Sequence, residues 1–343
     1  MYSKLRHIIL CLISGWLLSS CVSDSPEARD ETHGAELQFA GELTRSVTTN
    51  INTEGSWFSL FGEKRFQGEF SVSGPIVIFD NTPVTYRGSG WTYGEPEYWF
   101  PQHEYSFVAV HPGAVFSESG TDARYSDASL SFSYTLPLSE GDEVNIPDLA
   151  DLVVAAHRRM YRESISSAAP VKLNFFHILS RIDFRLKNDN VADILKVTKI
   201  ELEGADRTGA FSITPAPLLS SGTQTDDYNC HWGGISNRGT VTANIDAAVP
   251  RNEEFSLFAD NEALFMIPQP DNKGVIVKIS YTIVNAGKDD KEVTLTVDTP
   301  IGGWEMGKKY IYTVNVQERY ITFTVNVADW KDGTENDLKV PRK

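Results

Sequence analysis

Basic residues are scarce in this sequence relative to acidic ones. Its 343 residues include 31 Lys and Arg against 46 Asp and Glu, which gives a formal net charge of −15. Nucleic-acid binding without sequence preference needs clustered Lys and Arg to neutralise phosphates, and this composition excludes it. The chain is 41% hydrophobic and 11% aromatic, so it is not disordered as a whole. At roughly 150 residues per domain, we expect two domains.

Long hydrophobic runs are also missing. The apolar run at residues 8–18 is followed by small residues and preceded by Lys4 and Arg6. It is about half of the roughly 20 residues that a membrane-spanning helix needs. A basic start, a short apolar run and small residues are typical of a secretory signal peptide, which we place at residues 1–20.

The end of this predicted signal carries a second pattern. Leu18-Ser19-Ser20-Cys21 resembles the lipobox of bacterial lipoproteins. That resemblance implies that Cys21 is the first mature residue and carries acyl chains such as palmitate, which anchor the protein to a membrane. The alternative is an ordinary cleaved signal with an incidental cysteine.

Cysteine is rare, with only three in the chain. Cys11 would leave with the signal and Cys21 would carry lipid, so Cys230 would remain alone. We therefore expect no intramolecular disulfide in the mature chain. Cys230 lies in a Gly-rich segment that we interpret as a loop, where it would act as a small buried hydrophobic residue.

Catalytic motifs are absent as well. The sequence has no G-x-S-x-G, H-E-x-x-H, P-loop, dinucleotide-binding or C-x-x-C pattern. His103 and His111 flank a strand-like segment at an even spacing and are the one weak candidate for a metal site. A pair of carboxylates for glycoside hydrolysis stays open, since their separation is a three-dimensional property. We expect no cofactor, no metal and no enzymatic activity.

Alternating apolar and polar residues dominate the chain from Leu37 onward, after a polar segment at residues 21–36 that we interpret as a flexible tether. The alternation predicts half-buried strands. It is clearest at residues 130–136, 171–175, 182–186, 275–283, 310–316 and 321–327. We expect an all-β fold of β-sandwich domains at 37–166 and 167–343, with polar loops at 162–169 and 218–237.

One segment departs from this alternation. Leu149, Leu152, Val153, Ala156 and Met160 recur at helical spacing behind a Pro-Asp pair. This spacing predicts a short helix, and the fold is expected to hold at most one or two such helices.

Four stretches carry a further, composite pattern. They read YWFP with YSFVA (98–109), IPDLADLVVA (146–155), LNFFHILSRIDF (173–184), and WEMGKKYIYT with VADW (304–330). In this order and spacing they resemble the fimbrillin family, the subunits of donor-strand-assembled (type V) pili of Gram-negative anaerobes and their related surface lipoproteins. The resemblance implies two transthyretin-like β-sandwich domains in tandem and a structural or adhesive role on the outer membrane, without catalysis.

The resemblance also implies how the subunits assemble. Family members are exported as outer-membrane lipoproteins, and an arginine-specific protease then removes the first strand. Another subunit fills the groove with a strand of its own. Carried onto this chain, the cut falls between Arg45 and Ser46, with Arg29 as a competitor that would open no groove.

The short segment after Trp330 bears on the position that the protein would take in a pilus. Only thirteen residues follow Trp330 and they contain a turn-like stretch, which disfavours donation of this tail and favours a tip or accessory subunit over a stalk subunit. The alternative function is a stationary surface lipoprotein that binds glycan or a host protein. It would be favoured if the rings of Trp91, Trp99 or Trp232 lined an exposed groove.

Overall fold

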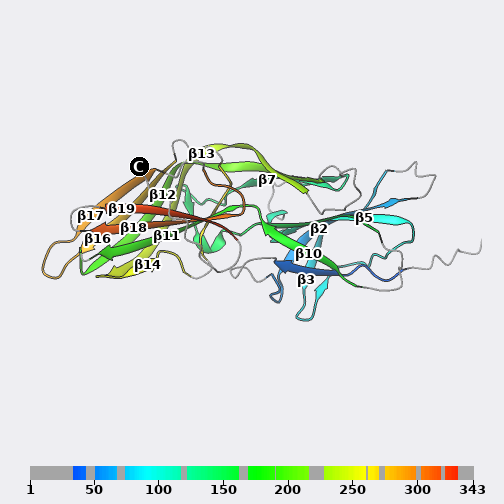
Figure 1. The fold of residues 1–343 in the computed structure, drawn as a ribbon, viewed down its shortest axis with the longest axis horizontal. Coiled ribbons are helices and arrows are strands. Elements are labelled where there is room, and N and C mark those ends of the chain that lie inside the picture. Colours follow the sequence, from blue (N-terminus) through cyan, green and yellow to red (C-terminus); the bar gives the residue numbers. More distant parts are fainter. Residues whose placement is uncertain are drawn as a thin grey trace, which may run out of the picture.

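The computed structural model describes residues 34–43, 51–67, 74–116, 122–161, 169–189, 191–215, 228–259, 262–269, 275–298, 303–317 and 321–330. Within these residues the protein is all-β, as predicted, with two 3-10 helices, η1 (Gly113–Phe116) and η2 (Ile146–Asp148). Figure 1 shows an elongated molecule with the N-terminal strands at one end and the C-terminal strands at the other. No helix among the described residues has the length and apolar character to cross a membrane.

The first sheet holds most of the N-terminal strands. Its order is β1-β10-β9-β5-β2-β3-β4, so that β1 and β4 form its two edges. The strands span β1 (Phe39–Leu43), β10 (Val171–His177), β9 (Val153–Tyr161), β5 (His103–His111), β2 (Trp57–Phe66), β3 (Ile76–Tyr86) and β4 (Trp91–Thr92).

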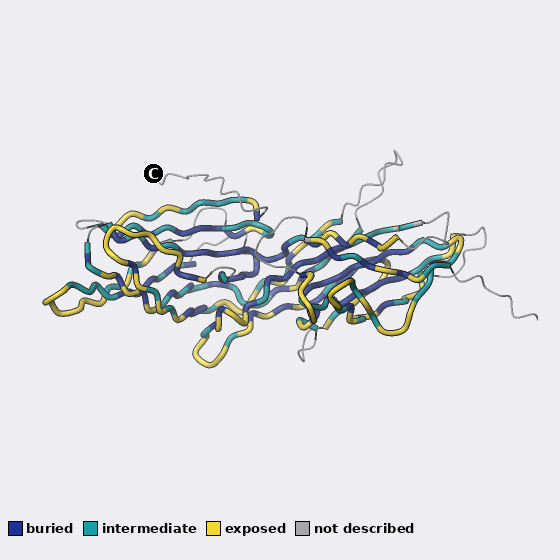
Figure 2. Tube along the Cα trace, turned by 90° about the horizontal axis from the view of Figure 1, so that it is seen from below, coloured by how far each residue is buried: buried dark blue, intermediate teal, exposed yellow. Residues whose placement is uncertain are grey.

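The centre of this sheet is buried on both faces. Val153 and Ala155 of β9 belong to a hydrophobic core of the first sheet alone. Leu152 and Val154 point the other way, into a larger core shared with the C-terminal strands. Figure 2 shows buried stretches of the chain, in dark blue, along the length of the molecule. A strand buried on both faces is a continuous apolar run without alternation.

This burial explains why the predicted helix over residues 149–160 is wrong. The structure has the single turn η2 followed by strand β9, which is paired between β5 and β10. A short apolar run cannot be assigned to a helix or a buried strand from its periodicity alone. Here the pairing with β5 on one side and β10 on the other stabilises the strand.

The other two sheets pack face to face over the larger core. One has the order β14-β11-β18-β19 with β15 also on β11, and the other β17-β16-β12-β13-β8 with β7 on β12 and β6 on β7. The strands of the first are β11 (Ser180–Asp189), β14 (Glu254–Ser256), β15 (Leu264–Met266), β18 (Lys308–Gln317) and β19 (Ile321–Asp329). Those of the second are β6 (Arg124–Ser126), β7 (Ser129–Thr135), β8 (Glu143–Val144), β12 (Ile194–Pro215), β13 (Tyr228–Pro250), β16 (Ile276–Val284) and β17 (Lys291–Asp298).

The strands predicted by alternation correspond to β7, β10, β11, β16, β18 and β19. The polar segment at 218–237 is a loop only in part, because residues 228–237 belong to β13. This part of the prediction is wrong, and the reason is that β13 pairs with β12 along its whole length, so polar residues are held in a ladder by their backbone.

The β12–β13 hairpin links the two halves of the chain. The C-terminal part of β12 pairs with β7, with Ile213 opposite Leu130 and Thr208 opposite Thr135. Strand β10 lies C-terminal to residue 166 and yet belongs to the first sheet. The division at residue 166 into two tandem domains stays a prediction. These pairings show that strands from each side of residue 166 join sheets formed mainly by strands from the other side.

Candidate functional site at the edge of the first sheet

Strand β1 is bound to the rest of the sheet on one side only. It pairs in parallel with β10 over five residue pairs, from Phe39 opposite Val171 to Leu43 opposite Phe175. Its other side faces β4 and has no strand partner in the described structure. A sheet edge of this kind presents unpaired backbone groups to a further strand.

The side chains of this segment alternate between the core and solvent. Leu37 and Phe39 are buried at 0% and 4% exposure, whereas Gln38 and Glu42 are exposed. The ring of Phe39 makes edge-to-face contacts with Phe79, Tyr93 and Phe107, at centroid distances of 5.7, 5.8 and 5.3 Å. Such aromatic pairs add to the free energy gained from burial. Two large side chains therefore hold this edge strand in the core of the sheet.

The chain just before β1 is anchored by backbone contacts. The Leu37 N–H donates to the Glu97 carbonyl at 2.8 Å, and the Tyr93 hydroxyl donates to the Leu37 carbonyl at 2.6 Å. Burial raises the pKa of Tyr93 to about 12, so its hydroxyl stays neutral and remains a donor at physiological pH. Trp99 N–H adds a bond of 3.0 Å to the Ala35 carbonyl.

A groove separates β1 from β4, the opposite edge of the same sheet. Its volume is about 660 Å³, and its lining includes residues 36–42 together with Asn52, Tyr86, Trp91 and Tyr93. The Trp91 indole lies above Gly41 and donates its Nε1–H to the Asn52 amide oxygen at 3.1 Å. The sheet thus curls until its two edges face each other without pairing, and this open seam is the candidate functional site.

The residues predicted to be processed lie outside the described residues. This applies to the lipidation site Cys21, to Arg45 and Ser46, and to the competing Arg29. The described part of β1 ends at Leu43, two positions before Arg45 in the sequence. The prediction of a cut after the first strand is therefore compatible with the strand bounds and stays a prediction.

The aromatic residues considered as a glycan platform are mostly core residues. Trp99 is 1% exposed and Trp232 is 7% exposed, while Trp91 is half-buried beside the groove. Trp232 donates its Nε1–H to the Ile178 carbonyl at 2.7 Å inside the larger core. One of the three rings is thus left for contact with a ligand.

The two histidines considered for a metal site lie far apart. His103 and His111 occupy opposite ends of β5, which at about 3.3 Å per residue puts roughly 26 Å between their backbones. His111 is buried and bonds through Nε2 to the Ser56 hydroxyl at 2.9 Å. Burial lowers the pKa of His111 to about 4. No group of three or more His, Cys, Asp or Glu side chains with metal-binding geometry occurs among the residues that the structure describes.

Cys230 lies half-buried on β13 and not in a loop as predicted. Burial raises the pKa of its thiol to about 12. A thiol with a raised pKa is a poor nucleophile. The interpretation of Cys230 as a small hydrophobic residue agrees with its packing against the larger core.

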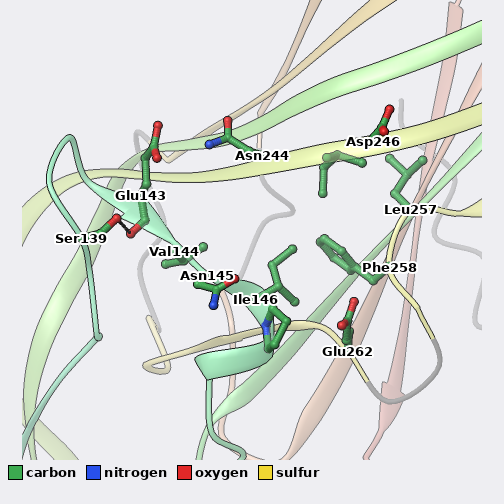
Figure 3. A pocket seen from close by; sticks show the side chains of 12 residues that line it. Ser139, Glu143, Val144, Asn145, Ile146, Asn244, Asp246, Leu257, Phe258 and Glu262 are labelled. Carbon is green, nitrogen blue, oxygen red and sulfur yellow. Dashed lines mark hydrogen bonds between the residues drawn. The ribbon is translucent and has the colours of Figure 1, made fainter.

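A second cavity of about 360 Å³ opens beside η2. Figure 3 shows the apolar side chains of Ile146, Leu257 and Phe258 and the carboxylates of Glu143, Asp246 and Glu262 among its lining. Asp246 already pairs with Lys196 at 3.4 Å. A mixed lining of acidic and apolar side chains does not by itself define a ligand.

Sequence reasoning missed Gly41, one of the two residues that shape the open seam, and it considered the other, Trp91, as a candidate for contact with glycan. Gly41 and Trp91 lie fifty positions apart, on strands that are not neighbours in the sheet order. The available signal was a glycine inside an alternating strand, which often marks the close approach of another group. The identity of that group followed only from the curling of the sheet.

Comparison with known proteins gives concordant results. A family model described as fimbrillin-like matches residues 44–330. The fimbrium subunit Fim1C of Phocaeicola vulgatus is 24% identical over 350 residues, covering 90% of this chain and 89% of that protein. The crystal structure of a fimbrial protein from Bacteroides vulgatus superposes with a TM-score of 0.59 at 17% identity, covering 86% of this chain and 99% of that chain. At this identity the structural similarity concerns the fold alone.

Proposed function

The chain belongs to the fimbrillin-like family, and on this premise we propose that it is a non-catalytic subunit of a surface fimbrium. In this proposal β1 is removed and a strand from a neighbouring subunit takes its place. The protein would be exported as a lipoprotein, anchored to the outer membrane through Cys21, and cut between Arg45 and Ser46. Its partners would then be other fimbrial subunits.

The observation that carries this proposal is the one-sided attachment of β1. Five parallel pairs to β10 and two buried side chains hold it, while its other edge faces an open groove. After a cut beyond Leu43, the strand would be linked to the body by noncovalent contacts alone. Fully burying a Leu or Phe side chain contributes about 1.5–3 kcal/mol. Removal of β1 would lose these contributions, and a strand from another subunit in its place would restore them.

The packing of the last described strand, β19, supports the role of strand acceptor. Strand β19 pairs with β18 over nine residue pairs. Trp330, at its end, stacks on His177 with centroids 3.6 Å apart and on Phe265 with centroids 5.5 Å apart. Release of β19 as a donor would break this ladder and expose Trp330. We therefore place the protein as a tip or accessory subunit, which needs only to accept a strand.

The experiment that tests the proposal compares two arginine substitutions in the producing cells. Arg45→Ala is expected to leave the N-terminal segment and its lipid on the protein and to abolish boiling-sensitive ladders on gels. Arg29→Ala, the matched control, is expected to give a mature N-terminus at Ser46 and normal ladders. N-terminal sequencing and intact mass distinguish the forms. Ladders that persist in Arg45→Ala with β1 still attached would contradict the proposal.

The second candidate function, a stationary lipoprotein that binds glycan or a host protein, rests on Trp91 alone. Its half-buried ring beside the groove is the one observation in its favour. In that case acylated Cys21 would be the only form on cells, and no ladder would occur in the wild type.

A further inference from the structure

We propose that the space left when β1 is removed from the first sheet accepts only strands with a defined pattern at their inward positions. The pattern is a large apolar residue, a second large apolar residue and then glycine, at alternate positions along the strand. This rule rests on the proposed strand exchange and adds to it the chemical identity of the partner segment. It follows from the three inward positions that Leu37, Phe39 and Gly41 now occupy.

The first two positions are deep pockets. Leu37 is completely buried, and Phe39 lies among the rings of Phe79, Tyr93 and Phe107. A small or polar side chain in either place would leave a void or an unpaired polar group in the core. Both changes are unfavourable in a packed interior.

The third position has little room for a side chain. A Cβ atom on Gly41 would lie 3.1 Å from Ile51 Cδ1 and 3.3 Å from Trp91 Cε2 and Cζ2. Gly41 is not among the glycines with positive φ, so its backbone conformation does not require glycine. The requirement comes from space alone. Alanine would need shifts of a few tenths of an ångström, and a branched side chain adds further atoms to this crowded position.

Trp91 is held where it closes this position. Its Nε1–H bonds to Asn52 at 3.1 Å, and its ring contacts those of Phe58 and Tyr86 at centroid distances of 4.7 and 5.4 Å. An indole fixed at its polar end and on its ring cannot swing away without losing these contacts. Trp91 therefore determines specificity at the third position.

This chain's own C-terminal segment does not fit the rule. Strand β19 contains no glycine, and Val325 stands four residues after Ile321, where the pattern needs one. The single glycine of residues 321–343, Gly333, has polar or charged residues two and four positions away on both sides. The pattern thus fails in either chain direction. Residues 321–343 of a second copy therefore do not satisfy the rule, and the partner that we infer is a different subunit whose donor segment carries the apolar–apolar–glycine pattern.

The test measures exchange of synthetic strands into the full chain. A unique protease site is inserted between Arg45 and Ser46, the purified chain is cut, and fluorescent peptides with the sequence of residues 36–43 compete for the groove. The native and Gln38→Val peptides are expected to enter equally well, because residue 38 faces solvent. The Gly41→Val peptide is expected to bind roughly ten- to one-hundred-fold more weakly, which is the usual range for overpacking a core. The Gly41→Ala peptide should lie between them.

Compensating changes in the groove make the test specific. Ile51→Val removes the atom that lies 3.1 Å from the added Cβ, and Trp91→Ala removes the ring. Each is expected to recover binding of the Gly41→Val peptide relative to the native one. Equal binding of the native and Gly41→Val peptides to the unchanged groove would overturn the rule.

Failure of the two proposals can be distinguished. If no peptide enters the groove, the native one included, strand exchange itself is wrong. The packing rule is tested separately in the uncut chain, where Gly41→Val should lower the thermal midpoint and Ile51→Val should recover part of the loss. An unchanged midpoint in uncut Gly41→Val would overturn the rule irrespective of exchange.

Discussion

Two of the parallel strand pairings among the described residues differ in how they are enclosed. In the first sheet, β1 pairs with β10 over five residues, and no described strand pairs with its other side. In the C-terminal half, β18 pairs in parallel with β11 over nine residues and in antiparallel with β19 over nine more. Parallel pairing therefore places β1 at the edge of its sheet, whereas β18 lies between two other strands. The strand with one flanking strand is therefore the one that we expect to open more easily.

Side-chain packing increases the difference. Beside β1 lies an open groove of about 660 Å³. On β18, Tyr312 is completely buried, stacks on Phe184 with centroids 5.1 Å apart, and accepts a hydrogen bond of 2.9 Å from Trp304 Nε1. Elements with few enclosing contacts open locally at a lower free energy than the global unfolding of the protein. We therefore expect β1 amides to exchange with solvent faster than β18 amides.

The largest expected effect is on the enclosed strand. Tyr312→Ala removes a fully buried ring and leaves the Trp304 N–H without its acceptor, so the free energy of unfolding should fall by about 4–5 kcal/mol. Denaturant unfolding measures the loss. Thr313→Ala, at the neighbouring, partly exposed position, is the control and should change it by less than about 1 kcal/mol. A similar loss in both variants would contradict the enclosed role of Tyr312.

A smaller effect is expected on the peripheral strand. Phe39→Ala should lower the unfolding free energy by about 3 kcal/mol, at the low end for buried rings, because an edge strand can relax into the open groove. Hydrogen exchange is the sharper measurement. Protection should fall in β1 and β10 while that of β18 follows only the global loss. Equal losses of protection in β1 and β18 would show that the two strands open together.

Acid should weaken the first sheet through His111. Burial lowers the pKa of this imidazole to about 4, below the value of about 6.5 that it has in an unfolded chain. Between these values the unfolded chain binds the proton more tightly, so stability present above pH 6.5 is lost as the pH falls towards 4. The loss is on the order of 2–3 kcal/mol. The difference in unfolding free energy between wild type and His111→Gln, measured from pH 7 to pH 4, should shrink by this amount, and a constant difference would contradict it.

The smallest expected effect concerns the anchor before β1. Tyr93→Phe removes the hydroxyl that donates to the Leu37 carbonyl and keeps the ring, so the loss should be about 1 kcal/mol. Peptide exchange into the cut chain should become correspondingly faster. Tyr86→Phe is a suitable control, because the Tyr86 hydroxyl bonds only locally to the Gly88 carbonyl. Equal exchange rates in the two variants would show that Tyr93 does not hold the strand.

Sequence alternation predicted strands well wherever one face is buried. Tyr310, Tyr312, Val314 and Val316 of β18 alternate with partly exposed residues in the structure as in the prediction, apart from Ile311. Alternation failed in β9, where Val153 and Val154 face different cores and both are buried. It also said nothing of β13, whose polar residues are held by backbone pairing.

The all-β class and the family follow from the sequence by itself. Alternation, turn residues and the order of the four motifs can be recognised without knowing which strands pair. The open seam could not be predicted in this way. Gly41 and Trp91 meet only because seven strands curl until the two edges of the sheet face each other. That closure depends on the pairing and twist of every strand between them, which no local pattern encodes. Tertiary structure alone therefore decided where the groove lies and which side chains line it.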